Sequence, residues 1–349
     1  MMHTVDQSCR LIALAPAYPR PANGKVLNMG VRVCVLIVGL LVSRPLFSQS
    51  DQPATSRSNG TDSSASKVPS STDASAKLDL TPDSHGALSQ DQMRQLFRVV
   101  AAKDQENDKL LRDYTYVERD VQNNLDGNGK TKSTEIKTYE VLEIYGEQVQ
   151  RLIAKDDKPL DAKEAAKEEE KIQKIIDKRK NESDEDRKRR EEKEQKERQE
   201  EKKFTAEVAD AYDFRLVGTE TIGGRETWVI DGEPHPGFEP HIKEAKFLSK
   251  FHGRVWIDKS DLQLAKLDVE AIDTVALGWV LARIHKGTRL VLEQNRINDE
   301  VWLPQRVSFK FDARVALFKG YKMDGDQTFR YYKKFRTSAK IVGMQEVKP

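Results

Sequence analysis

The sequence predicts an α+β fold in which a curved antiparallel sheet of about eleven strands is covered by an N-terminal helix and interrupted by a charged helical hairpin. Three observations predict it. From residue 114 onward, short segments with alternating apolar and polar residues follow one another, joined by turn signals. One capped amphipathic helix precedes them, and a long charged run divides them into two sets. Because so wide a sheet seldom stays flat, we expect it to curl into a half-barrel.

The N-terminal region 1–50 predicts export. Residues 35–42 (VLIVGLLV) form a strongly apolar run that is too short to span a bilayer, which needs about 20 residues. Arg32 before the run and the small residues Ser48 and Ser50 after it are typical of a cleaved signal peptide. Translation from Met29 would give an ordinary signal of this kind. The alternative is an uncleaved membrane anchor.

Composition excludes several classes of function. Both cysteines, Cys9 and Cys34, lie in the leader, so the mature chain is expected to use neither a disulfide nor a thiolate nucleophile. The net charge is only +2 although 33% of the residues are charged, which removes the electrostatic argument for nucleic acid. We therefore expect a periplasmic or otherwise exported cell-envelope protein that meets a membrane only transiently or through an uncleaved signal.

The next two segments are a tether and a helix. Residues 51–88 are rich in Ser, Thr, Asp and Ala and contain no Phe, Trp or Tyr, a composition typical of a disordered spacer. A capping box from Ser89 to Gln92 then begins an amphipathic helix that should end near Asp113. A strand begins at Tyr114, and the turn signal at residues 126–129 joins it to a second, with a third beginning at Gly146.

The insertion, residues 161–207, is predicted to be a solvated helical hairpin. Residues 163–203 hold 16 Lys and Arg and 15 Asp and Glu among 41 residues. Five pairs place an acid four residues before a base, as helices favour: Glu170–Lys174, Asp184–Lys188, Glu185–Arg189, Glu192–Lys196 and Glu194–Arg198. Residues 181–183 (NES) should separate two helices. The lack of an apolar heptad disfavours a coiled coil, and the mixed signs disfavour nucleic-acid binding.

From Tyr212 onward the chain is nearly all strand, completing a domain that spans 89–342 before a short tail, 343–349. Turn signals fall at residues 223–224, 259–261, 298–299 and 324–326. Val307, Phe309 and Phe311 alternate with polar residues, which indicates one apolar face. Residues 271–284 are apolar enough to form a short helix or a mobile lip.

The loop after residue 230 is the main candidate for chemistry. Glu233, His235, Glu239 and His241, with His252 further on, are residue types that bind zinc. Three prolines and a glycine among them indicate an irregular connection instead, and the histidines lack helical spacing. No G-x-S-x-G motif is present, and Asp258 is a lone carboxylate at a strand end. We expect no metal site, no cofactor and no enzymatic activity.

Two stretches, FRLVGTETIGGRETWVIDGEP and GRVWIDKSDLQLAKLDV, together with the capped helix after a signal peptide, resemble the exported lipoprotein-sorting proteins. These are the LolA/LolB-like half-barrels, to which RseB is related. The resemblance covers about Ser89 to Ile341, apart from the charged insertion. It implies a curved sheet around helices, an apolar cavity for acyl chains, and a functional arginine in an early strand, for which Arg119 is the candidate.

The resulting hypothesis is a non-enzymatic envelope protein that binds a lipid or lipoprotein acyl chain in the hollow of the half-barrel. The alternative is an interaction or sensing module in which the charged hairpin contacts another envelope protein. A metal-dependent hydrolase using the histidine loop is the least favoured hypothesis. The candidate cavity-lining residues are Val117, Trp228, Ile230, Trp256, Leu267, Val269, Val307, Phe309 and Phe311.

Overall fold

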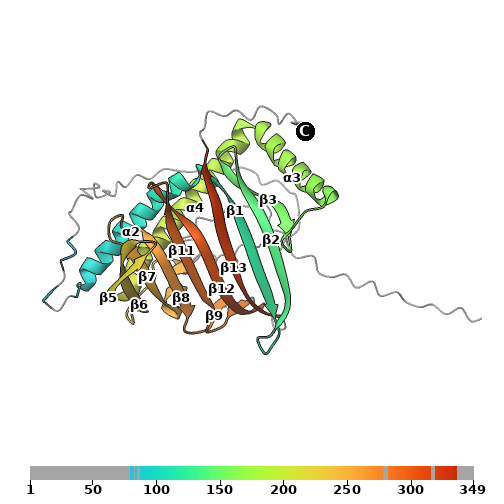
Figure 1. Ribbon diagram of the computed structural model, residues 1–349. Coiled ribbons are helices and arrows are strands. Elements are labelled where there is room, and N and C mark those ends of the chain that lie inside the picture. Colours follow the sequence, from blue (N-terminus) through green and yellow to red (C-terminus); the bar gives the residue numbers. More distant parts are fainter. Residues whose placement is uncertain (1–78, 82, 85–86, 278–281, 316–318, 336–349) are drawn as a thin grey trace, which may run out of the picture.

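The computed structural model describes residues 79–81, 83–84, 87–277, 282–315 and 319–335 (Figure 1). The leader 1–50, the start at Met29, most of the spacer 51–88 and the tail 343–349 lie outside the described residues. Within those residues, no helix is both long and apolar enough to cross a membrane.

A single antiparallel sheet confirms the predicted α+β class. Its strand order is β4-β3-β2-β1-β13-β12-β11-β8-β7-β6-β5, and the short strands β9 and β10 extend it beside β12. The strands are β1 (Tyr114–Leu125), β2 (Thr131–Ile144), β3 (Glu147–Lys155), β4 (Lys158–Pro159), β5 (Tyr212–Ile222), β6 (Arg225–Pro234), β7 (Phe251–Asp258), β8 (Leu264–Ala271), β9 (Val275–Leu277), β10 (Ala282–Ile284), β11 (Arg289–Ile297), β12 (Val301–Val315) and β13 (Lys319–Lys334). The described part of residues 271–284 therefore forms β9 and β10 instead of a helix.

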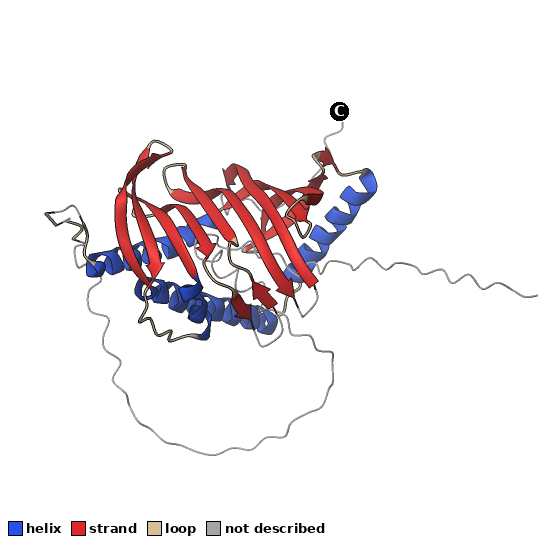
Figure 2. Cartoon of the chain, turned by 90° about the horizontal axis from the view of Figure 1, so that it is seen from below, coloured by secondary structure: helices blue, strands red, loops and turns tan. Residues whose placement is uncertain are grey.

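The helices lie along one side of the curved sheet, apart from α3 at its end (Figure 2). They are α2 (Gln90–Leu111), α3 (Ala162–Lys180), α4 (Asp184–Ala211) and the 3-10 helix η1 (Lys243–Lys250). The predicted capping box is present: Ser89 Oγ accepts the backbone N–H of Gln92, and the Gln92 side chain accepts that of Ser89. Met93, Leu96 and Val100 form the buried stripe of α2 that packs toward the sheet.

The strands before and after the insertion are joined at one seam, where β1 pairs with β13. The predicted turn at residues 324–326 is wrong, because these residues lie inside the continuous strand β13. β1 and β12 pair with them from both sides. The Asn123 side chain donates to Asp324, and Arg306 is paired with Asp326. Pairing on both sides thus outweighs the local turn preference of Asp-Gly-Asp.

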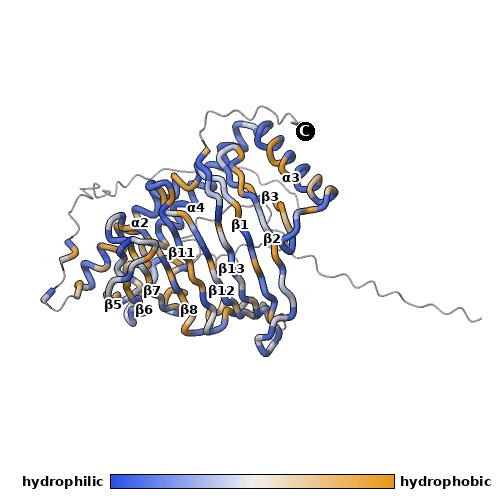
Figure 3. Tube along the Cα trace, in the orientation of Figure 1, coloured by the Kyte–Doolittle hydropathy of each residue, from blue (hydrophilic) through white to orange (hydrophobic). Residues whose placement is uncertain are grey.

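The other turn signals are confirmed. Gly223 and Gly224, with φ of +57° and +80°, connect β5 to β6. Asn298 and Asp299, with φ of +52° and +56°, connect β11 to β12. Consecutive residues at positive φ match the twist of an antiparallel hairpin, and Gly and Asn tolerate them best. In β12, which follows the second of these turns, hydrophobic residues alternate with hydrophilic ones along most of the strand (Figure 3).

The charged insertion consists of two helices, as predicted, but it is solvated only along its middle. Ser183 caps α4 by accepting the N–H of Asp186, which places the helix break at residues 181–183. On α3, Ile172, Ile175 and Ile176 pack against Leu142, Ile144 and Val149 of β2 and β3. At the other end α4 continues past the expected boundary at 207, and its last turns are buried. The insertion is therefore part of the domain core at both ends.

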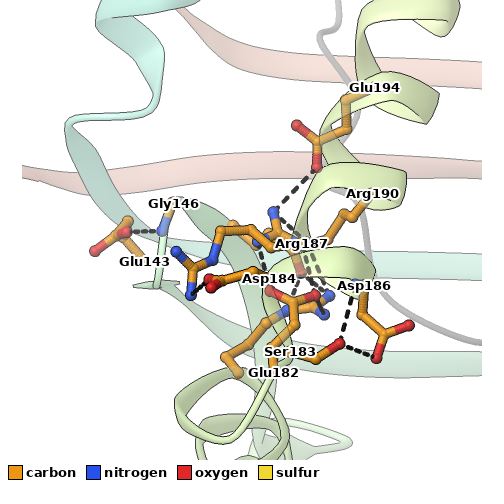
Figure 4. A network of polar contacts seen from close by, with 11 residues as sticks. Glu143, Gly146, Glu182, Ser183, Asp184, Asp186, Arg187, Arg190 and Glu194 are labelled. Atoms are coloured by element: carbon orange, nitrogen blue, oxygen red, sulfur yellow. Dashed lines mark hydrogen bonds and ion pairs between the residues drawn. The ribbon is translucent and has the colours of Figure 1, made fainter.

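Ion pairs fix the α3–α4 turn to the turn between β2 and β3 (Figure 4). Arg190 pairs with Glu182 at 2.8 Å and with Glu147 at 3.6 Å, and Arg179 pairs with both carboxylates. The Glu182 side chain is only 8% exposed. A network of partly buried charges fixes the position of one turn against the other, which isolated ion pairs on the surface do not. From this anchor α4 runs 28 residues to the opposite edge of the sheet at β5.

Candidate ligand-binding cavity

The strand register assigns each predicted lining residue to one face of the sheet. Residues paired across antiparallel strands share a face, and neighbours along a strand alternate. A row of pairs therefore joins Ile230, Val255, Leu267, Leu292 and Val307 on what we call the inner face. The inner face is the one covered by α2, since Ile230 packs in the same cluster as Met93 and Leu96. The opposite face is called the outer face.

Seven of the nine predicted lining residues lie on the inner face: Trp228, Ile230, Leu267, Val269, Val307, Phe309 and Phe311. The other two lie on the outer face. Val117 is between the inner-face residues Tyr116 and Glu118, and Trp256 packs with Val229, Ala265 and Trp302. The sequence shows that side chains alternate along each strand. Which of the two alternating sets faces the inner side depends on how the strand pairs with its neighbours.

An apolar cavity of about 100 Å³ lies on the inner face, between β5–β8 and the helices α2, α4 and η1. Ile230, Leu267 and Val269 are the predicted residues that line it. Val307, Phe309 and Phe311 belong to the hydrophobic cluster that continues along the same face, and Trp228 packs against the cluster below α2. The remaining walls are Phe97, Phe204, Val208, Tyr212, Phe214, Gly232, Phe247, Leu248, Phe251, His252, Gly253 and Val255.

A ring contact and hydrogen bonds join the helices to the sheet along one side of the cavity. The Phe97 ring of α2 is stacked on the Phe214 ring of β5, with 3.9 Å between centroids and 17° between planes. The Tyr212 hydroxyl donates to the carbonyl oxygen of Leu248 at 2.9 Å, which holds η1 over β5. Gln90 joins α2 to β5 at the same place. Its side-chain Nε2 donates to the Phe214 carbonyl oxygen, and its Oε1 accepts the Phe214 N–H. Two elements distant in sequence, α2 and η1, thus meet over one patch of β5.

Sequence reasoning missed the wall residues contributed by the insertion and by η1. Phe204, Val208 and Ala211 have helical spacing at the end of the charged run, and this signal was readable in FTAEVADA. Phe247 and Leu248 lie in the segment interpreted as a connection, and η1 is too short for periodicity to reveal it.

The histidine loop brings two of its five candidate ligands together, Glu233 and His252, and pairs its other two histidines with carboxylates that were not candidates. His235 Nδ1 lies 2.9 Å from Asp213 Oδ1, His241 lies against Glu207 of α4, and His252 Nδ1 lies 3.5 Å from Glu233. Each histidine thus has a different carboxylate neighbour. No group of three His, Cys, Asp or Glu side chains suited to a metal ion occurs in the part of the chain that the structure describes.

The inner face becomes polar toward β1 and β2. Glu118 is only 5% exposed, accepts the Gln150 amide at 2.8 Å, and lies beside Asp120. Burial raises the pKa of Glu118, and the negative charge of Asp120 raises it further. Burial also raises the pKa of Asp120. Arg119, the arginine suggested by the resemblance, points to the outer face and forms a bidentate pair with Asp157 at 2.7 Å.

Replacing Glu118 with glutamine should make the protein more stable at alkaline pH. The native carboxyl binds a proton in the folded state at pH values where the unfolded chain has lost it, so its contribution to stability falls as pH rises. Glutamine keeps the hydrogen bond with Gln150 and cannot ionise. We expect Glu118→Gln to gain about 1–2 kcal/mol near pH 9 and almost nothing near pH 5. Urea unfolding at both pH values measures this, and an equal gain at both would contradict it. The control is Glu226→Gln, at a side chain that is 75% exposed.

No protein-family profile matches the sequence, and the comparison with curated proteins found no match. Several solved structures are similar, and three of them follow. A putative outer membrane lipoprotein-sorting protein domain from Vibrio parahaemolyticus is 12% identical, with a TM-score of 0.29, over 70% of this chain and 95% of that chain. A DUF1329 family protein from Desulfovibrio piger is 10% identical, with a TM-score of 0.25, over 71% and 95%.

The third structure is a LolA superfamily protein from Nitrosomonas europaea. It is 8% identical, with a TM-score of 0.20, over 69% of this chain and 97% of that chain. The chain is similar to solved lipoprotein-sorting and LolA-superfamily structures, the group that its sequence resembles.

Proposed function

We propose that this protein is a non-enzymatic binding protein that takes a lipid or lipoprotein acyl chain into the inner-face cavity. One observation carries the proposal: the cavity walls are almost entirely aliphatic and aromatic, and they lie between the sheet and three helical elements. Burial of a chain there is favourable by about 0.8 kcal/mol per methylene before losses. Sites for small ligands are typically concave and largely apolar in this way.

The size of the cavity indicates that binding involves an opening movement. An engineered cavity of about 150 Å³ holds one benzene molecule, so about 100 Å³ admits only a short part of an acyl chain. The contacts between α2, η1 and β5 are the ones expected to separate, because Phe97 and Leu248 line the cavity there. These contacts are few compared with the pairing between strands, so the helices should move while the sheet remains intact.

The proposed setting is the cell envelope, where the protein would meet acyl chains and contact a membrane transiently. The support for it is the apolar run at residues 35–42 with its flanking residues. A role in sorting outer-membrane lipoproteins would fit this setting. The direct test is to purify the exported protein and identify co-purifying lipids by mass spectrometry. Absence of lipid, together with no binding of a fluorescent fatty acid, would refute the proposal.

A polar substitution in the cavity should reduce binding. Val269 lines the cavity, whereas Val291, on the neighbouring strand β11, pairs with Asp268 and points to the outer face. We expect Val269→Asn to weaken fluorescent fatty-acid binding about tenfold, since the amide would lose its water when the chain enters. Val291→Asn is the matched control and should bind like the native protein. Equal affinities for the two variants, with both folded by circular dichroism, would place the ligand elsewhere.

A second candidate function is contact with an envelope protein through α4. The buried residues of this helix, Phe204, Glu207, Ala209 and Ala211, all lie in its last turns, and its middle is polar on every side. Arg189 and Lys196 are 70% and 77% exposed. Deleting residues 163–203 would also uncover the β2–β3 surface under Ile172, so substitutions are the cleaner test.

Reversing the two exposed charges should abolish partner capture under this second function. The double variant Arg189→Glu, Lys196→Glu is compared with Lys174→Glu, at an α3 side chain that is 73% exposed. Chemical cross-linking in intact envelopes measures capture. Under this function a cross-linked partner is lost in the double variant alone, and fatty-acid binding is unchanged. An unaltered cross-linking pattern in the double variant would exclude the middle of α4 as the contact surface.

A further inference from the structure

Two arginines lie directly opposite each other on the outer face, at one rim of the sheet. Arg283 of β10 is the register partner of Arg314 of β12. Their neighbours along the strands, Ile284 and Ala313, are buried on the inner face, so both arginines point to the outer face. Side chains paired in this way have Cβ atoms roughly 5 Å apart, and like charges in such a pair are destabilising. The packing of the sheet by itself therefore does not favour this pair.

No carboxylate of the described residues neutralises the arginine pair. Neither arginine forms an ion pair within that part of the chain, and both are exposed. Asp312, two residues before Arg314 on the same face, has Lys322 as its partner at 3.4 Å. Arg289 of the neighbouring strand β11 is by contrast neutralised by Asp268. The two positive charges at the rim are thus available to an external anion.

The surface beside the arginine pair is open. The row of register partners across four strands is Ala276 of β9, Arg283, Arg314 and Gly320 of β13. Ala276 is exposed, and a Cβ added at Gly320 would meet no atom within 4 Å. The two arginines are thus flanked by the two smallest residue types. Sites for small ligands are typically concave, so an open row of this kind favours a broad anionic surface over a small anion.

The chain next to the arginine pair is apolar by sequence. The residues that connect β9 to β10 are Gly-Trp-Val-Leu (278–281), and those that connect β12 to β13 are Ala-Leu-Phe (316–318). Tryptophan is enriched where proteins meet the membrane–water interface, and apolar residues together with cations strengthen binding to anionic lipids. The proposed site is the arginine pair, and this composition bears only on its partner, which it indicates to be a membrane surface.

We propose that Arg283 and Arg314 form a docking site for the phosphate groups of an anionic lipid membrane. A guanidinium group donates two parallel hydrogen bonds to phosphate oxygens, and two such groups side by side suit neighbouring lipid headgroups. Attraction to the negative membrane surface offsets the repulsion between the two arginines. The inference rests on the proposed membrane setting, and it does not depend on the cavity.

The test measures binding of the exported protein to lipid vesicles by co-sedimentation. Vesicles of phosphatidylcholine are compared with vesicles in which about one lipid in four is phosphatidylglycerol, and the native protein should bind the anionic vesicles at least about tenfold more tightly. This difference should disappear at high salt, because the Debye length shortens. Each arginine near such a surface adds roughly fivefold in affinity, so the double variant Arg283→Gln, Arg314→Gln should bind about 30-fold more weakly. Equal binding of the native protein to both kinds of vesicle, or native affinity in the double variant, would overturn the inference.

The matched control is the double variant Arg215→Gln, Arg330→Gln, which removes the same charge from the outer face away from this rim. Arg215 of β5 is 71% exposed, and Arg330, toward the other end of β13, is also exposed. The control should bind anionic vesicles within about threefold of the native protein, because distant exposed charges are screened. An equal loss in both double variants would assign the binding to net charge and refute the role of the pair. The variant Arg283→Gln, Arg314→Gln should melt no lower than the native protein, because it removes a repulsion.

Two further readouts separate the inference from its alternatives. Inorganic phosphate that displaces the protein from vesicles, where chloride at the same ionic strength does not, would indicate a site for a free anion and refute membrane docking. Binding of a fluorescent fatty acid should be unchanged in the variant Arg283→Gln, Arg314→Gln. If the native protein bound no fatty acid but discriminated between the vesicles as expected, the cavity function would be refuted and the docking site would stand.

Discussion

Replacing Gly325 with alanine should destabilise the protein by about 3 kcal/mol or more. An added Cβ would lie 2.5 Å from Phe309 Cζ and still closer to the carbonyl oxygen of Val121. Phe309 is a side chain and can shift, but the Val121 carbonyl belongs to the backbone of β1 at the seam where β1 pairs with β13. Overpacking in a well-packed site typically costs about 1–3 kcal/mol and more where the backbone must shift.

The matched control is Gly320→Ala on the same strand, where an added Cβ meets nothing within 4 Å. Chemical denaturation should show a change within about 0.5 kcal/mol for this control. The double variant Gly325→Ala, Phe309→Leu should recover part of the loss, since it relieves the contact with the ring but not the contact with Val121. A Gly325→Ala variant as stable as its Gly320 counterpart would mean that β13 does not run continuously through this residue.

Replacing Arg225 with methionine should cost about 3–5 kcal/mol, the usual consequence of leaving a buried charge without its partner. Asp258 is fully buried, and its carboxylate accepts the Arg225 guanidinium at 2.6 and 2.8 Å and the N–H groups of Ser260 and Asp261. Arg225 also lies over the Trp302 ring at 5.5 Å. The lone carboxylate of the WID stretch thus fixes a turn, as the sequence suggested.

The effect of Arg225→Met should depend on pH. Burial alone would raise the pKa of Asp258, but the hydrogen bonds from Arg225 and from the turn hold it below its usual value. A lowered carboxyl pKa contributes stability that is present above about pH 4 and is lost as pH falls through the folded pKa. Without Arg225, burial dominates and the group gains a proton more readily. The loss in stability should therefore be largest at neutral pH and smaller near pH 4.

Two variants control for this result. Arg215→Met removes a partner of Asp231, but the Arg215 side chain is 71% exposed and Arg254 still pairs with Asp231. It should cost less than about 1 kcal/mol, as exposed ion pairs usually do. Adding Asp258→Asn to Arg225→Met should restore part of the stability at neutral pH, because asparagine still accepts the turn N–H groups without a charge. A similar cost for Arg215→Met and Arg225→Met would show that burial of Asp258 is not the cause.

Much of the fold was predictable because local physical chemistry encodes it. The capping box at Ser89, the glycine turn at 223–224 and the helix break before Ser183 each depend on residues within a few positions of one another. Three of the five predicted acid–base pairs form: Glu170–Lys174, Glu185–Arg189 and Glu194–Arg198. Asp184 pairs instead with Arg187, three residues further along the helix.

The cavity was only partly predictable, because its walls come from segments far apart in the chain. Phe97, Phe214 and Leu248 meet over β5 although long stretches separate them in sequence. The charged run concealed the apolar end of α4, since its composition is dominated by solvated residues. Val117 and Trp256 show the same limit on a smaller scale, because a shift of one residue in strand pairing moves a side chain to the opposite face.

The sequence by itself determined the elements of this protein: alternating strands, a capped helix and a charged helical insertion. These follow from periodicity, capping and turn chemistry, which act over a few residues. Tertiary structure alone decided that β1 pairs with β13, that the predicted turn at 324–326 is straight strand, and that the insertion returns to cover the inner face. Pairing and burial couple residues more than a hundred positions apart, and their free energy exceeds the local preferences from which a sequence is read.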